Sequence, residues 1–180
     1  TLFRSFTILS SCASRQLEEV TFRRTVIPVQ ELLDAAGKYF KKSMKNRSER
    51  IELEIEPMEA KVIGDVNQLR FLLENLIDEA LTVREDGVIR LQARLDNEYI
   101  RFLFTDTRSE KSVEELNQLF YPNLARMTSG EKGELRGTEY LVCKQIIRDH
   151  DEFAGRRGCR INAEPAEGGG FTVYFTIPHR

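Results

Sequence analysis

The chain is poor in the residues that build metal centres and disulfide frameworks. Only three of its 180 residues are cysteines and two are histidines. Cys12, Cys143 and Cys159 are widely spaced and form no CxxC pair or Cys/His cluster. The sequence therefore predicts neither a zinc site nor a disulfide framework, and it favours a reducing, cytoplasmic setting.

Long hydrophobic runs and an excess of one charge are also missing. No apolar run reaches the roughly 20 residues that a transmembrane helix needs, and the first residues lack the layout of a signal peptide. The net charge is −2 and the two signs are interspersed. We therefore expect no nucleic-acid partner and no membrane segment in this chain. The chain begins at Thr1 rather than at a methionine, which indicates a piece of a longer protein.

The hydrophobic pattern predicts one domain. A chain of 180 residues that is 41% hydrophobic can bury a sizeable core. We expect residues 1–21 to be the end of an upstream helix and residues 22–180 to form the domain. Apolar periodicity predicts strands at 21–27, 51–55 and 62–63, hairpins at 89–104 and 159–177, and helices at 28–40, 65–81, 113–120 and 138–149. This order indicates an α+β fold, a two-layer α/β sandwich whose helices cover one face of a mixed sheet.

The helix predicted at 65–81 is the most informative segment. Its leucines recur at helical spacing, Asp65 can cap its first turn, and Gln68 stands where a capping box places its second member. Away from the apolar stripe, Asn75 and Glu79 lie four residues apart and therefore on one ridge. Their oxygen atoms could reach a magnesium ion or a water molecule, although for such a pair taken alone a solvated helix face is the simpler explanation.

This segment resembles the N box of histidine-kinase ATP-binding domains, whose fold is shared with gyrase-type topoisomerases and heat-shock chaperones. The family pattern is approximately an aspartate, three residues, a leucine and then NLLxNA, and Asp65, Leu69 and residues 75–80 fall on it. Glu79 replaces the second family asparagine, a magnesium ligand. The resemblance implies that Asn75 binds nucleotide and magnesium, and that Glu79 binds magnesium, since a carboxylate can also ligate this ion.

Three further boxes follow in the family's order, so that the resemblance extends over residues 22–178. Residues 106–110 stand at the DxGxG box, residues 120–123 at an FxPF-like element, and residues 137–140 at the GLGL box before a helix. The resemblance implies that Asp106 accepts a hydrogen bond from the adenine amino group and that Gly137 contacts the nucleotide. It also implies bacterial two-component signalling with ATP and magnesium as cofactors.

The departures from these boxes oppose ordinary ATP binding. Arg108 and Glu110 replace both glycines of the second box, which predicts a narrowed or filled pocket and a penalty for any positive φ there. Glu139 replaces a glycine at a helix N-terminus, where phosphate would bind. For unit charges about 5 Å apart at an effective dielectric near 20, the repulsion is about 3 kcal/mol. A contact of Arg108 with Glu110 or Glu139 could compensate.

The two histidines offer no phosphoacceptor. His150 and His179 lie in no H-box-like helix, and the position of His150 near a predicted helix C-terminus has a structural reason in the helix dipole. We therefore predict no catalytic residue and no autophosphorylation within this chain. The loop at 122–136 is either the counterpart of the family's mobile ATP lid or an ordinary surface loop.

The sequence thus favours a degenerate ATP-binding domain that acts as a regulatory or interaction module of a histidine-kinase-like signalling protein. The alternative is an active ATP-binding domain that phosphorylates a histidine elsewhere, with Asn75, Glu79, Asp106 and Gly137 binding Mg-ATP. A plain dimerisation domain is a third possibility. The expected partners are the upstream domain of the same protein, which could carry a membrane anchor and a homodimer interface, and a signalling protein such as a response regulator.

Overall fold

Within residues 22–122 and 137–180, which the computed structural model describes, the chain forms a mixed five-stranded sheet. Its strands are β2 (Ile51–Ile55), β4 (Gly87–Asp96), β5 (Tyr99–Asp106), β6 (Ile161–Pro165) and β7 (Phe171–Pro178). Their spatial order is β2-β4-β5-β7-β6; β2 is parallel to β4 and all other neighbours are antiparallel. Two further strands, β1 (Thr25–Pro28) and β3 (Lys61–Gly64), pair with each other in a separate antiparallel ribbon.

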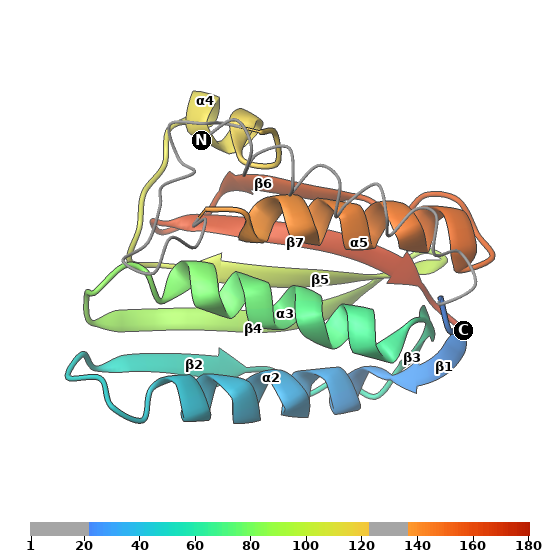
Figure 1. Cartoon of the computed structure of the whole chain (residues 1–180), viewed down its shortest axis with the longest axis horizontal. Coiled ribbons are helices and arrows are strands. Elements are labelled where there is room, and N and C mark those ends of the chain that lie inside the picture. Colours follow the sequence, from blue (N-terminus) through green and yellow to red (C-terminus); the bar gives the residue numbers. More distant parts are fainter. Residues whose placement is uncertain (1–21, 123–136) are drawn as a thin grey trace, which may run out of the picture.

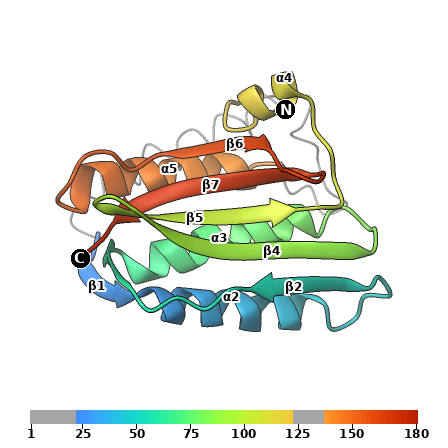
Figure 2. The same cartoon turned by 180° about the vertical axis from the view of Figure 1, so that it is seen from behind.

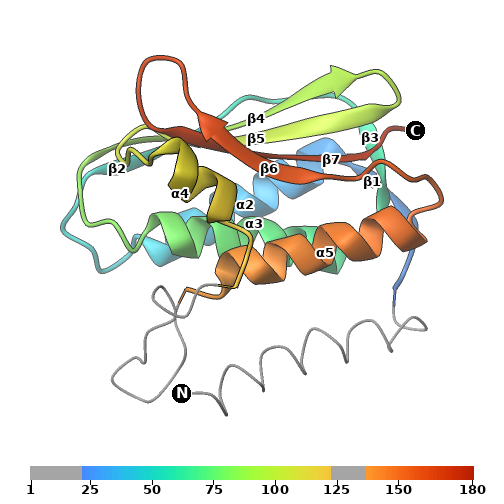
Figure 3. The same cartoon turned by 90° about the horizontal axis from the view of Figure 1, so that it is seen from above.

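Three long helices cover one face of the five-stranded sheet. These are α2 (Val29–Ser43), α3 (Val66–Ala80) and α5 (Glu139–Phe153), with α3 between the other two (Figure 1). Figure 2 shows the uncovered face of the sheet, and Figure 3 shows the helix layer and the strand layer from above. The short helix α4 (Val113–Gln118) lies beside β6. The predicted two-layer α+β sandwich is confirmed.

Period-two alternation in the strands separates the two faces of the sheet. Phe102 of β5 and Phe175 of β7 are paired in register and stack at 4.8 Å between ring centroids, beneath the helices. The opposite face carries ion pairs such as Arg90 with Glu54. The core therefore lies between the sheet and the helices, as the alternation predicts.

Several element boundaries differ from those predicted. The first strand begins at Thr25 rather than at residue 21, and Pro28 is the extended N-cap residue of α2 rather than part of its first turn. Helix α5 continues to Phe153, beyond the predicted end at residue 149. Ala154 is the C-cap residue, and Gly155 follows it with a φ of 92°, the left-handed conformation typical of a helix end.

Asp65 caps α3 as predicted, but Gln68 does not complete the capping box. The Asp65 carboxylate accepts hydrogen bonds from the backbone N–H groups of Asn67 (3.0 Å) and Gln68 (3.2 Å). The N–H of Asp65 itself donates to Nε2 of His150 at 3.0 Å, where a capping box would use Gln68. A reciprocal capping box does form at α4, between Ser112 and Glu115, and was not predicted.

His150 is therefore a buried connector between two helices, and its predicted role as a charge at a helix C-terminus is wrong. The ring is fully buried, and Nδ1 donates to the carbonyl of Ile146 at 2.8 Å because Nε2 must accept from Asp65. Burial lowers the pKa of His150 to about 4, although the Ile146 carbonyl and the Asp65 carboxylate oppose this shift. The imidazole is neutral at pH 7 and has no charge to place on the helix dipole.

Two predictions lie outside the described residues. These are the upstream helix end at 1–21 and all but Pro122 of the loop at 122–136. Among the helices of the described ranges, none combines the length and the apolar character that crossing a membrane requires.

Candidate functional site

The candidate site is built at the end of β5, around Asp106. This residue is the last of a central strand, with β4 on one side and β7 on the other. Its neighbours in register are Ile89 and Phe171, and only 2% of Asp106 is exposed. The sheet therefore fixes a buried carboxylate at the place where the sequence predicts the adenine acceptor.

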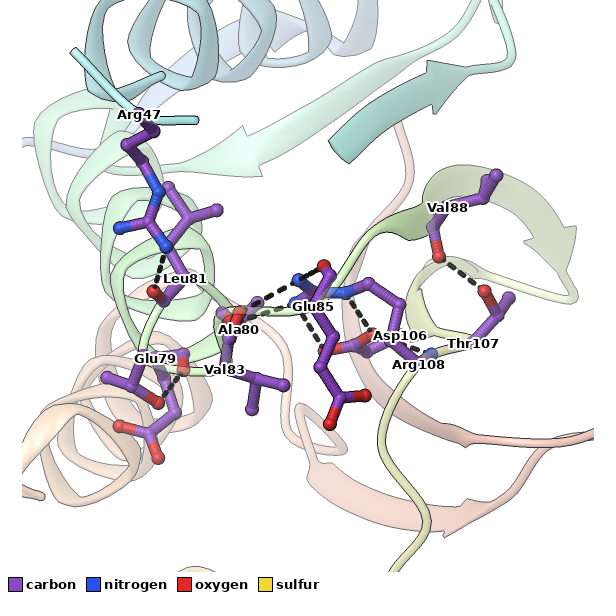
Figure 4. Close-up of polar contacts among 11 residues, drawn as sticks. Arg47, Glu79, Ala80, Leu81, Val83, Glu85, Val88, Asp106, Thr107 and Arg108 are labelled. Atoms are coloured by element: carbon purple, nitrogen blue, oxygen red, sulfur yellow. Dashed lines mark hydrogen bonds and ion pairs between the residues drawn. The ribbon is translucent and has the colours of Figure 1, made fainter. Parts of the chain in front are cut away.

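Arg108 forms an ion pair with this carboxylate. Its Nε donates to Oδ1 of Asp106 at 2.9 Å and its Nη2 donates to Oδ2 at 3.0 Å, which is a bidentate ion pair (Figure 4). The backbone N–H of Arg108 also donates to Oδ1, at 3.0 Å. The side chains of Arg108 and Asp106 are 1% and 3% exposed. The acidic partner of Arg108 is therefore Asp106, and not Glu110 or Glu139 as predicted.

The remaining hydrogen bonds of Arg108 go to the chain just after α3. Nη2 donates to the carbonyl of Ala80 at 2.7 Å, and Nη1 donates to those of Val83 at 3.0 Å and Glu85 at 2.9 Å. With the two bonds to Asp106, the guanidinium makes five hydrogen bonds, which equals the number of its N–H groups. Arg108 thus pairs with Asp106 and joins the end of β5 to the end of α3.

Helix α3 needs these contacts because its last turn contains no basic residue. The carbonyls at a helix C-terminus lack partners within the helix and carry partial negative charge. Arg108 binds Ala80 there, and Arg47 donates from Nη2 to the carbonyl of Leu81 at 2.7 Å. Figure 4 shows both arginines approaching the end of this helix. Two distant segments thus supply the cations that α3 lacks.

Two glycines make room for the pair. A Cβ atom at Gly87, where φ is 144°, would lie 2.6 Å from Cγ of Arg108. A Cβ atom at Gly170, where φ is 82°, would overlap the carbonyl oxygen of Asp106. Arg108 itself has no positive φ, so the backbone penalty predicted for this loop is absent at that position. Gly87 was not predicted as part of the site, because its importance depends on a contact with Arg108, which follows β5 far along the chain.

Asn75 and Glu79 differ from each other in their surroundings. Asn75 is 7% exposed and belongs to the buried face of α3, whereas the sequence placed it away from that face. Its Nδ2 donates to the carbonyl of Phe71 at 2.7 Å. Glu79 is partly exposed, and Figure 4 shows its side chain directed away from Asp106 and Arg108. In residues 22–122 and 137–180, no group of three or more His, Cys, Asp or Glu residues is arranged to hold a metal ion.

Carboxylates surround the N-terminus of α5, where phosphate would bind. Gly137 has a φ of 81°, and Glu139 begins the helix. Oε2 of Glu139 is buried and has no hydrogen-bond partner within the described part of the chain. Burial raises the pKa of Asp78 on α3, and the Glu139 charge raises it further, against the hydrogen bond from Tyr39. Carboxylates from α3 and α5 thus act on the same region, which opposes an anionic ligand.

Cys143 of α5 lies close to the carboxylates of Glu139 and Glu79. Burial raises the pKa of its thiol, and the charges of Glu139 and Glu79 add to this effect. Its Sγ lies 3.6 Å from the carbonyl of Leu72. The thiol is therefore protonated and packed between α3 and α5, and it is no nucleophile.

Comparisons with known proteins agree with the predicted family. Residues 64–180 match the family model described as histidine kinase-, DNA gyrase B-, and HSP90-like ATPase. The catalytic domain of histidine kinase ThkA is 21% identical, with a TM-score of 0.66 and coverage of 87% of this chain and 97% of that one. The mycobacterial sensor histidine kinase MprB is 19% identical, with a TM-score of 0.66 and coverage of 88% and 99%.

A third similar structure is a complex of histidine kinase ThkA with the response regulator protein TrrA. It is 18% identical to this chain, with a TM-score of 0.66, and the match covers 99% of this chain and 49% of that one. No curated protein sequence matches. At these identities the similar structures establish the fold.

Proposed function

Because this chain belongs to the histidine kinase-, DNA gyrase B-, and HSP90-like ATPase family, we propose that it is a degenerate ATP-binding domain that serves a signalling protein as a regulatory or interaction module. The observation that carries this proposal is the buried ion pair of Arg108 with Asp106. The carboxylate that would receive the adenine amino group is already bound from within the chain.

A nucleotide would have to displace this arginine from its present contacts. Removing one partner from a buried ion pair costs about 3–5 kcal/mol, because the other charge is left without a partner in a low-dielectric environment. The carbonyls of Ala80, Val83 and Glu85 would lose the hydrogen bonds that this arginine donates, although Ala80 would still accept from the N–H of Val83. A cost of this size lowers an affinity by more than a hundredfold.

The parts of the site that would bind phosphate and magnesium do not offset the cost of displacing Arg108. Glu139 places a carboxylate at the N-terminus of α5, close enough to Asp78 to raise its pKa. Asn75 is buried and its amide nitrogen is bound to its own helix, so only its amide oxygen remains for a ligand, and Figure 4 shows Glu79 pointing away from Asp106. The residues at this site therefore do not fit Mg-ATP, and the mechanism that we propose contains no phosphoryl transfer.

The retained function is then recognition of other proteins. We place the module in the cytoplasm, with the upstream part of its own protein and a response regulator as candidate partners. The fold it shares with a histidine kinase that was solved with a response regulator supports this choice. Asp106 and Gly137 are the residues that the resemblance assigns to the nucleotide boxes, and their presence is what favours the alternative of an active ATP-binding domain.

Phosphate incorporation distinguishes the two functions. We expect the full-length protein, incubated with radiolabelled Mg-ATP, to incorporate no phosphate, because neither end of the site accepts the nucleotide. The matched control is an Asp106→Asn variant, which should give the same background. Labelling of the unaltered protein that this variant abolishes would refute the proposal and establish the active domain.

A further inference from the structure

A groove outside the nucleotide site lies between α5 and the beginning of β6. It encloses about 320 Å³. Since β6 is the edge strand of the five-stranded sheet, the groove lies at the side of the molecule. The residues lining it are Lys144, Ile147, Arg148, Asp151, Cys159, Arg160, Ile161 and Asn162. The first four are spaced as one stripe of α5. The others are the two residues before β6 and the first two residues of that strand.

The floor of the groove is apolar and its rim is cationic. Ile147 and Cys159 are buried, and Ile161 is partly buried. Arg148 projects from the helix side and Arg160 from the strand side, and both residues are exposed. A pocket with an apolar floor and charged rim residues is the usual form of a site that recognises a protein segment.

The positive charge of this groove is not neutralised by its own acidic residue. Asp151 accepts hydrogen bonds from Arg157 at 2.9 Å and from the backbone N–H groups of Gly158 and Cys159. In the part of the chain that the structure describes, no ion pair involves Lys144, Arg148 or Arg160. Several other arginines on the surface are paired, including Arg90 and Arg94.

Lys144 is held at one end of this cationic rim. Its Nζ lies 4.1 Å from the centroid of the Tyr121 ring, a cation–π contact that limits its movement. Partial burial lowers the pKa of Lys144, and the neighbouring Arg148 lowers it further. The second effect is a repulsion between Lys144 and Arg148, which an anion in the groove would relieve.

From this arrangement we infer that the groove between α5 and β6 binds an acidic segment of a partner protein, with carboxylates between Arg148 and Arg160 and an apolar side chain on Ile147 and Ile161. The inference rests on the proposed function, because it names the chemistry of the partner that an interaction module would recruit. A nucleic acid could use the cations, but the floor offers apolar side chains rather than an array of exposed aromatic rings on which bases would stack.

The test uses a fluorescein-labelled peptide of alternating glutamate and leucine residues, with binding to the full chain measured by fluorescence anisotropy at 0.15 M salt. The variant Arg148→Glu/Arg160→Glu reverses two exposed charges of the groove. The control Lys41→Glu/Lys45→Glu reverses two exposed charges on and just after α2, with the same change in net charge. We expect the groove variant to weaken binding at least tenfold and the control to change it less than threefold.

The other outcomes overturn the inference. No binding of the peptide at millimolar protein, or equal weakening by both variants, would show that the groove does not recognise acidic segments. Tighter binding of a labelled single-stranded oligonucleotide, lost in the groove variant, would assign the groove to nucleic acid. Because the peptide experiment contains no nucleotide, its failure would leave the phosphate-incorporation result and the proposed function unaffected.

Discussion

Replacing Arg108 with alanine should lower the free energy of unfolding by about 3–5 kcal/mol, the range measured when one member of a buried ion pair is removed. Asp106, which is 2% exposed, would lose the guanidinium that pairs with it and keep only the hydrogen bond from the backbone N–H of residue 108. The carbonyls of Ala80, Val83 and Glu85 would lose the hydrogen bonds that Arg108 donates, although Ala80 would still accept from the N–H of Val83. Urea unfolding followed by circular dichroism measures the loss, provided that the slope against denaturant stays constant.

An exposed arginine supplies the matched control. Arg84 pairs with Glu49 at 3.1 Å, but its side chain is 70% exposed, so Arg84→Ala should cost less than about 1 kcal/mol. The double variant Asp106→Ala/Arg108→Ala should cost less than the sum of the single variants, because neither charge is then left alone. If Arg108→Ala were as mild as Arg84→Ala, Arg108 would not hold the site together.

The neutral state of His150 should make the domain less stable in acid. The pKa of this ring is about 4 in the folded protein and about 6.5 when unfolded, so between these values the unfolded chain binds more protons. Stability therefore falls as the pH drops from about 6.5 to 4. The gap corresponds to a loss of about 3 kcal/mol from this residue, complete near the folded pKa. Urea unfolding at pH 7, 5.5 and 4 measures it.

The control for this effect is His150→Gln, which retains a donor and an acceptor but does not titrate. The variant loses part of the packing with Phe22, whose ring lies 4.9 Å from that of His150, so it should be less stable at pH 7. Between pH 7 and pH 4, the unaltered protein should lose about 3 kcal/mol more unfolding free energy than the variant loses. A difference that does not change with pH would mean that His150 is not the titrating group.

The fold could be predicted from the sequence because local patterns determine most of it. The alternation of apolar and polar residues in β4, β5 and β7 predicted the hairpins and the buried face of the sheet. The spacing of the leucines predicted α3. Asp65 was predicted as an N-cap because that bond reaches only two or three residues along the chain. The order of the four sequence boxes indicated the family, which the match over residues 64–180 confirms.

Contacts between distant segments could not be predicted in the same way. His150 bonds a backbone group 85 residues away, and no periodicity indicates such a partner. Arg108 was predicted to fill the pocket, but its partners at Ala80, Val83 and Glu85 lie 23 to 28 residues back along the chain. One signal was available locally: Arg108 follows Asp106 by two residues at a strand end, where a turn allows the guanidinium to fold back on the carboxylate.

The most direct test of the proposal that Arg108 fills the nucleotide site is the melting temperature with and without millimolar Mg-ATP or Mg-ADP, checked by titration calorimetry. A ligand at about 100 times its Kd would stabilise the folded state by about 2.7 kcal/mol and raise the melting temperature by several degrees. With Arg108 bound to Asp106 and Glu139 at the phosphate end, we expect no shift and no heat of binding. A shift that Asp106→Asn abolishes would contradict this account and show that the site still binds nucleotide.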